Sequence, residues 1–164
     1  MSPEDPLAPS IRYRWTVLVM LTLVYTFNFI DRQILVILQE PIKADLGLSD
    51  AQLGLLSGFS FALVYVTAGI PIAWLADRGN RRNIVAVSLG FWSFMTALSG
   101  LAQNYGQLLA ARIGVGIGEA GGSPPSHSMV SDYFPAKQRG TALSFYSTGI
   151  YIGILIGFAA GGWI

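Results

Sequence analysis

The stretch Leu108 to Ser128, LLAARIGVGIGEAGGSPPSHS, decides the fold of this chain. It is long and apolar enough to cross a bilayer, yet Arg112, Glu119 and His127 lie inside it among glycines and prolines. A charge at the centre of a membrane helix costs roughly 2.5 to 3.5 kcal/mol even on lenient insertion scales. Such residues usually face a protein interior or a water-filled path. The stretch is therefore typical of a helix that lines such a path.

The composition places the chain among membrane proteins. Hydrophobic residues make up 52% and charged residues 12% of the 164 residues, against about a quarter charged in soluble domains, and the mean hydropathy is +0.53. The absence of cysteine excludes disulfides and thiol catalysis, and the single histidine, His127, excludes a metal site built on paired histidines. No nucleophile or cofactor motif indicates an enzyme, and no basic run indicates a nucleic-acid partner. We expect no metal and no cofactor.

The apolar runs predict an all-α polytopic membrane protein with a disordered tail over residues 1–11 and a membrane domain from residue 12 to 164. The predicted membrane helices are 15–38, 53–75, 84–102, 108–130 and 141–164. Residues 39–52 are predicted to form an aqueous loop that ends in a capping box starting at Ser49. The last run ends without a polar flank, so we expect the chain to be a fragment of a longer protein.

The positive charges predict the orientation of these helices. Seven Lys and Arg residues fall on the N-terminal tail and the even-numbered connections, whereas the odd-numbered connections hold only Lys43. We therefore expect the N-terminus on the cytoplasmic side of the inner membrane, with the bilayer as a partner.

The segment Ala73 to Arg82 resembles the signature loop of the major facilitator superfamily, G-x-x-x-D-R/K-x-G-R/K-R/K. The residues that match are Asp77, Arg78, Arg81 and Arg82. Ala73 and Asn80 stand in place of glycines, and asparagine tolerates the left-handed turn that a glycine would take. Positive-inside anchoring would explain the arginines but not the aspartate. The resemblance implies that Asp77 and Arg78 belong to a cytoplasmic network that latches neighbouring helices in one access state.

The run Arg112 to Gly116 resembles the R-x-x-x-G motif of the same superfamily, whose arginine is often linked to proton coupling. Glu119 lies about two turns beyond Arg112 on nearly the same face. Asp31, in the first helix, falls between them in depth. We predict a carboxylate, arginine, carboxylate cluster, in which one carboxylate holds a proton near neutrality because one arginine cannot neutralise two acids. Arg32 is expected only to pair structurally.

Two residues of this fourth span keep an alternative interpretation. Arg112 lies near the membrane surface and could instead extend its charge to water. His127 could relay protons or be a satisfied polar residue.

The glycines of this span have a simpler interpretation than their pattern suggests. Gly116, Gly118 and Gly121 match the dinucleotide fingerprint G-x-G-x-x-G, but no strand precedes them. Glycines 114, 118 and 122, at four-residue spacing, favour close approach of another helix. Pro124 and Pro125 predict a kink.

Several longer phrases resemble the bacterial branch of the Spinster-type transporters: NFIDRQIL (28–35), LGLSDAQLGLLSG (46–58), GIPIAWLADRGNRR (69–82), ARIGVGIGEAG (111–121) and SDYFPAKQRG (131–140). The resemblance implies the major facilitator fold, with the first five helices of the N-terminal six-helix half present and the C-terminal half missing. It implies proton-coupled alternating-access transport of a small or amphipathic solute, lipid-like or an organic anion, with Asp31, Arg112 and Glu119 as coupling residues. Tyr25 and Asn28 are candidates to line the cavity. A polytopic receptor or scaffold without transport activity is the alternative.

Overall fold

The computed structural model describes residues 9–161, which form helices joined by short connections. Most of the predicted tail, residues 1–8, lies outside the described residues, as do residues 162–164 of the last span. The end predicted for the tail is wrong, because α1 (Ile11–Ile37) already begins at Ile11. Its first turn is capped by Ser10, whose side chain accepts a hydrogen bond from the backbone N–H of Tyr13.

The second membrane span is one continuous helical segment made of three parts. These are α3 (Asp50–Gly54), a π-helical turn η1 (Leu55–Phe59) and α4 (Ser60–Arg78). Among the described helices, α1, the segment Asp50–Arg78 and α8 (Ala136–Gly161) are long and apolar enough to cross a membrane.

The remaining spans are less uniform. Helix α5 (Arg81–Ser99) begins with two arginines. Helices α6 (Tyr105–Ala120) and α7 (Ser123–Tyr133) follow one another along the fourth span. The predicted kink lies between them, at Gly121 and Gly122, and the two prolines fall in the first turn of α7, where a missing N–H is tolerated.

The segment predicted as an aqueous loop contains a helix, so this prediction is wrong for residues 39–46. Helix α2 (Gln39–Leu46) forms there and ends at Gly47, whose φ of 62° allows the left-handed cap. The helix is amphipathic, and its Ile42 and Leu46 pack against buried leucines of α3, η1 and α6. Short amphipathic helices are stabilised by such packing rather than by their own propensity.

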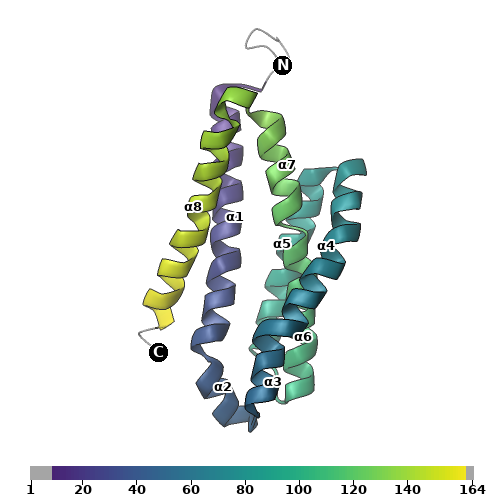
Figure 1. The fold of residues 1–164 in the computed structure, drawn as a ribbon, viewed down its shortest axis with the longest axis vertical. Coiled ribbons are helices and arrows are strands. Elements are labelled where there is room, and N and C mark those ends of the chain that lie inside the picture. The colour runs from purple at the N-terminus through teal and green to yellow at the C-terminus, as the bar shows by residue number, and fades with distance from the viewer. Residues whose placement is uncertain (1–8, 162–164) are drawn as a thin grey trace.

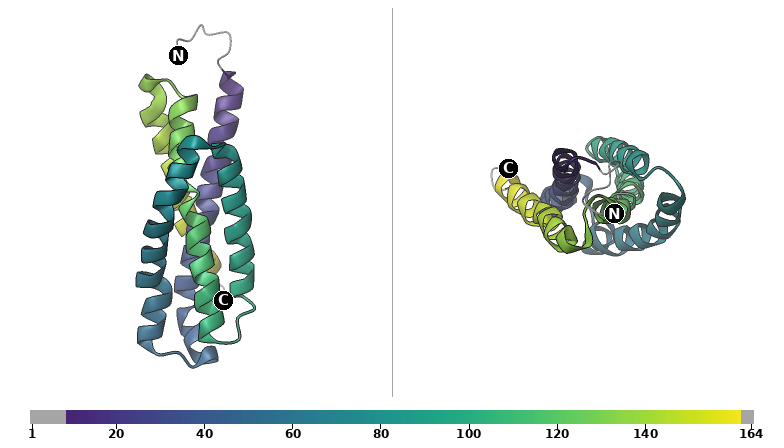
Figure 2. Two further views of the ribbon diagram at one scale, coloured as in Figure 1. Left: turned by 90° about the vertical axis from the view of Figure 1, so that its right-hand side faces the viewer. Right: turned by 90° about the horizontal axis from the view of Figure 1, so that it is seen from above.

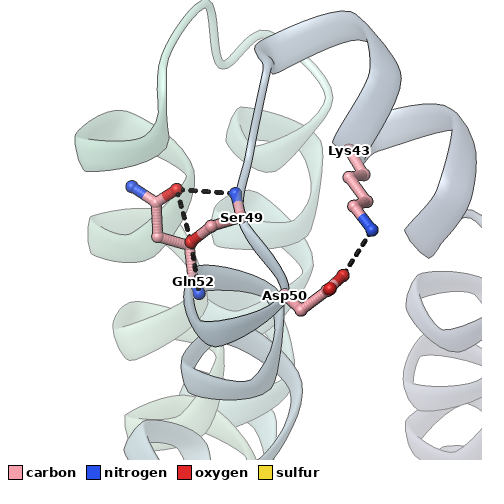
Figure 3. Close-up of polar contacts among 4 residues, drawn as sticks. All are labelled: Lys43, Ser49, Asp50 and Gln52. Atoms are coloured by element: carbon pink, nitrogen blue, oxygen red, sulfur yellow. Dashed lines mark hydrogen bonds and ion pairs between the residues drawn. The ribbon is translucent and has the colours of Figure 1, made fainter.

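The predicted capping box follows directly after this turn. Ser49 Oγ accepts a hydrogen bond from the backbone N–H of Gln52, and Gln52 Oε1 accepts one from the backbone N–H of Ser49 (Figure 3). Lys43 on α2 also donates a hydrogen bond to Asp50 on α3 (Figure 3). The first connection is therefore an ordered element at one end of the bundle.

The successive spans α1, α3 to α4, α5, α6 to α7, and α8 run alternately up and down, and α8 packs along α1 (Figure 1). Helix α6 contacts both α4 and α5. The α4–α5 and α7–α8 connections lie toward the end of the bundle where α1 begins (Figure 2). Helices α2 and α3 lie at the opposite end (Figure 1).

Glycines bring two pairs of helices into close contact. On α6, a Cβ atom added at Gly114 or Gly118 would come within 2.7 Å of Met95 or Trp92 on α5, which confirms the predicted close approach. Gly121, rather than the predicted Gly122, makes the closest contact, against Ser88. On α8, a Cβ atom at Gly149 or Gly153 would come within 2.8 or 2.6 Å of backbone carbonyls of α1. These seams fix α1 to α8 and α5 to α6.

Candidate functional site

Two charged residues of the fourth span are buried at the middle of the bundle. Glu119 lies midway along the span formed by α6 and α7, and 0% of its surface is exposed. Arg112, two turns earlier, is 6% exposed. The Arg112 side chain therefore packs inside the bundle, which argues against an extension of its charge to the surface.

The partner of Glu119 is Arg32 on α1. The Nε and Nη2 atoms of Arg32 both lie 2.8 Å from Oε2 of Glu119. The Arg32 side chain is 32% exposed, so the pair joins a fully buried carboxylate to a guanidinium that reaches the surface. The prediction that Arg32 only pairs structurally did not anticipate this contact with a predicted coupling residue.

Arg112 makes no ion pair within 4.0 Å among residues 9–161. Its Nε atom is buried without a hydrogen-bond partner in the described part of the chain, and the same holds for Oε1 of Glu119. Buried polar atoms are normally satisfied. Each of these two atoms therefore keeps unused hydrogen-bonding capacity within the described part of the chain.

Asp31 points to a different neighbour than the one predicted. Its Oδ2 atom accepts a hydrogen bond from Thr96 Oγ1 on α5 at 2.6 Å. It lines a groove of about 390 Å³ with Thr96, Ser93 and Trp92 of α5. The charges of Asp31, Arg112 and Glu119 are close enough to act on one another.

Arg32 changes the charge balance of this group. We use "polar cluster" for Asp31, Arg32, Arg112 and Glu119. The cluster contains two guanidinium groups and two carboxyl groups, so it is neutral when both acids are ionised. The sequence-based prediction included only one arginine and therefore left one acid without a neutralising charge, whereas in the structure Arg32 supplies a second positive charge beside Glu119. A proton added to either acid leaves one net positive charge.

Aromatic rings surround the arginines of the polar cluster. The Cζ atom of Arg32 lies 5.4, 5.0 and 5.2 Å from the ring centroids of Phe29, Phe61 and Tyr65. The Cζ atom of Arg112 lies 5.4 Å from the same Phe61 ring. These distances allow cation–π attraction.

Tyr25, Asn28 and His127, the other residues predicted for the interior, differ in burial. Tyr25 is half-buried and stacks on Tyr146 of α8 with ring centroids 4.5 Å apart. Asn28 is buried. His127 is exposed and packs edge-to-face with Tyr146, with ring centroids 5.1 Å apart.

The signature loop is shorter than predicted, because only Gly79 and Asn80 lie outside helices α4 and α5. Asn80 has φ −82° and ψ 103°, so the expected left-handed turn is wrong there. Its side chain instead accepts a hydrogen bond from the backbone N–H of Asn83 and caps α5.

The charged residues of the loop contact different partners. Arg81 pairs with Asp132 at the end of α7 and approaches Asp77 at 4.0 Å. Arg78 stacks on Trp74, with its Cζ 3.9 Å from the ring centroid. Arg82 lines a cavity of about 440 Å³ together with Asp77 and Asp132.

The sequence did not predict the contacts that three residues make in these sites: Arg32, Thr96 and Asp132. Only Arg32 carried a signal, since it is a charge inside an apolar run next to Asp31. In the part of the chain that the structure describes, no three His, Asp or Glu side chains gather so as to hold a metal ion.

Comparisons with known proteins agree with this architecture. The family model described as Major Facilitator Superfamily matches residues 21–164. The crystal structure of a bacterial homolog to the human lysosomal transporter Spinster, in an inward-facing and occupied conformation, superimposes with a TM-score of 0.90 at 48% identity. The match covers 94% of this chain and 33% of that one.

Two curated relatives are similar over most of this chain. An MFS-type efflux pump of Mycolicibacterium smegmatis is 40% identical over 92% of this chain and 35% of its own length. A probable galactarate/D-glucarate transporter of Bacillus subtilis is 35% identical over 97% of this chain and 36% of its own length. The chain thus spans about a third of the length of these relatives.

The fold and the buried charges define a polytopic α-helical membrane protein. The chain belongs to the major facilitator superfamily, and within it resembles the bacterial Spinster homolog. The predicted fold class and family are confirmed.

Proposed function

We propose that this chain is part of a secondary transporter that moves an organic anion together with protons by alternating access. The observation that carries the proposal is Glu119, which is fully buried with one oxygen on Arg32 and the other without a partner among residues 9–161. A buried carboxylate inside a membrane helix is a functional candidate by default, because an apolar residue would cost less free energy at the same position.

The polar cluster supports an anion as the substrate. Protonation of Asp31 or Glu119 leaves a net positive charge, which attracts an anion, and release of the proton removes that attraction. Proton and anion would therefore bind together. The similarity to a probable galactarate/D-glucarate transporter supports this class. A lipid-like molecule with a phosphate group would meet the same requirement.

The signature loop supports alternating access. Arg81 joins α5 to α7 through Asp132, at the end of the bundle where α1 begins. Such a contact would hold these helix ends together in one access state and separate in the other. The N-terminus is proposed to lie in the cytoplasm, on the same side as these arginines.

Uptake into proteoliposomes tests the proposal with the complete transporter. Vesicles with an alkaline interior in an acidic bath are given radiolabelled D-glucarate or a lysophosphatidic acid as probes, and a dye records internal pH. We expect acid-driven uptake of at least one probe with internal acidification. Glu119→Gln should abolish the response to the pH gradient and retain probe-for-probe exchange.

Two outcomes contradict the proposal. If Asp31→Asn and Glu119→Gln both retain acid-driven uptake in direction and rate, the coupling assignment is wrong. If the wild type moves neither a probe nor protons, the receptor or scaffold interpretation gains support.

A further inference from the structure

Phe61 touches both arginines of the polar cluster. Its ring centroid lies 5.0 Å from Cζ of Arg32 on α1 and 5.4 Å from Cζ of Arg112 on α6. Phe61 itself belongs to α4. One ring therefore connects charges from two other helices.

The local structure of α4 directs this ring toward the cluster. The π-helical turn Leu55–Phe59 ends immediately before Ser60, whose backbone N–H bonds to the carbonyl of Leu55. A π turn holds one residue more than an α turn, and each residue turns a helix by about 100°. The π turn therefore rotates Phe61 and Tyr65 about the helix axis relative to α3, which precedes it in the same span. Both rings consequently face Arg32.

The Phe61 ring also lies next to Gly116, the glycine of the R-x-x-x-G motif on α6. A Cβ atom added at Gly116 would lie 3.5 Å from two carbons of the Phe61 ring and 3.4 Å from Val64. These are ordinary van der Waals distances for the added Cβ atom, so the ring lies over this face of α6 with room for one methyl group between it and the Gly116 backbone. Arg112 is one helical turn earlier on this helix, and the ring therefore lies against the same face as its guanidinium.

The two arginines depend on Phe61 to different degrees. Arg32 is also held by Glu119 and by the rings of Phe29 and Tyr65. Arg112 has no ion pair in residues 9–161, and its Nε is unpartnered there. Within the described residues, Phe61 supplies the aromatic ring at cation–π distance from the Arg112 guanidinium.

We propose that Phe61 is a positioning residue that fixes the guanidinium of Arg112 beside Glu119 and keeps both arginines within one polar cluster. The face of the ring attracts both cations, which would otherwise repel each other in a medium of low polarity. An aliphatic side chain of similar volume would fill the space without this attraction. The inference rests on the proposed function only for its consequence in transport.

Chemical modification tests the positioning directly. The complete transporter in lipid nanodiscs is treated with phenylglyoxal, which reacts with guanidinium groups, and modification at each arginine is followed by mass spectrometry. A cation–π contact at a partly desolvated site corresponds to a factor of about 5 to 30. We therefore expect Phe61→Leu to raise the modification rate of Arg112 by about fivefold or more, with a smaller rise at Arg32.

Matched variants separate positioning from packing. Phe61→Tyr keeps the ring and should keep the Arg112 rate within about twofold of wild type. Tyr65→Leu removes a ring that contacts Arg32 and should raise the rate at Arg32 but not at Arg112. An unchanged Arg112 rate in Phe61→Leu overturns the proposal. An equal rise at Arg112 and at distant arginines would indicate general loosening and would overturn it as well.

Transport assays add the functional consequence. Acid-driven uptake of D-glucarate should show a raised KM in Phe61→Leu, with the wild-type KM retained in Phe61→Tyr. If the wild type moves no probe, the proposed function fails for those probes, while the modification rates still decide the role of Phe61.

Discussion

Arg32 and Glu119 form an asymmetric pair: both Nε and Nη2 of Arg32 contact a single oxygen of a carboxylate that is completely buried, while the arginine is one-third exposed. The loss of Glu119 and the loss of Arg32 therefore have different effects. Without Glu119, the guanidinium can be hydrated from its exposed side. Without Arg32, the carboxylate remains in the interior with Arg112 as its nearby positive charge.

This asymmetry predicts unequal stabilities for two charge-removing variants of the complete transporter. Arg32→Gln should lower the free energy of unfolding by up to about 3 to 5 kcal/mol, the usual result of removing one partner of a buried ion pair. Glu119→Gln should cost clearly less, and the double variant should recover most of the loss of Arg32→Gln. Chemical denaturation at neutral pH measures all three. Equal losses in the two single variants would contradict the pairing.

The glycine seam between α1 and α8 predicts a second stability difference. Gly153→Ala places a methyl group 2.6 Å from the carbonyl oxygen of Thr26 and 2.7 Å from Cβ of Phe29, so the helices must separate. Overpacking of this kind costs about 1 to 3 kcal/mol. Gly140 lies on the same helix, and a Cβ atom added there meets no atom within 4 Å other than those of its own stretch of helix.

The control variant should behave in the opposite way. Alanine is favoured over glycine inside a helix by about 1 kcal/mol, so Gly140→Ala should be neutral or slightly stabilising. Thermal unfolding in the same detergent compares the two variants. A Gly153→Ala protein as stable as Gly140→Ala would show that the two helices do not pack closely in solution.

The elements that the sequence predicted well are those set by local pattern. Apolar runs marked the spans, and the Ser49 capping box and the close approach at Gly114 and Gly118 follow from residue type and spacing. Helix α2 was missed because its stability depends on leucines of other helices. A single-sequence pattern does not contain that packing.

The composition of the polar cluster was only partly predictable. Depth along a helix follows from counting residues, so Asp31 was placed between Arg112 and Glu119 in depth. The rotation of each helix about its axis depends on how it packs against its neighbours. That rotation turns Arg32 toward Glu119 and Asp31 toward Thr96. The contact between Arg81 and Asp132 likewise joins two helices whose distance the sequence does not give.

The ion pair between Arg81 and Asp132 predicts an effect on access from the end of the bundle where α1 begins. Met129 is buried beside this pair and lines the same cavity. In a cysteine-free complete transporter carrying Met129→Cys, Arg81→Asp should speed labelling by a water-soluble thiol reagent. An exposed ion pair contributes about 0 to 1 kcal/mol, so the increase should not exceed about fivefold.

A charge exchange provides the control for this prediction. Arg81→Asp combined with Asp132→Arg should return labelling toward the wild-type rate. Arg78→Gln should change it little, because Arg78 stacks on Trp74 and makes no ion pair among the described residues. If the exchanged pair labels as fast as Arg81→Asp alone, the pair does not hold the helices together.

The ordered connection between α2 and α3 predicts that its cap stabilises it more than its ion pair does. Ser49→Ala removes the hydrogen bond to the first turn of α3 and should cost about 1 kcal/mol, seen as faster hydrogen exchange at Gln52 and Leu53. Lys43→Ala breaks an ion pair whose acid, Asp50, is largely exposed, and should change exchange little at neutral pH. The hydrogen bond to Asp50 raises the pKa of the Lys43 ammonium, so the small contribution of the pair is present at neutral pH and is lost only as the pH rises through that raised value. A larger exchange increase for Lys43→Ala than for Ser49→Ala would show that the ion pair, not the cap, orders this connection.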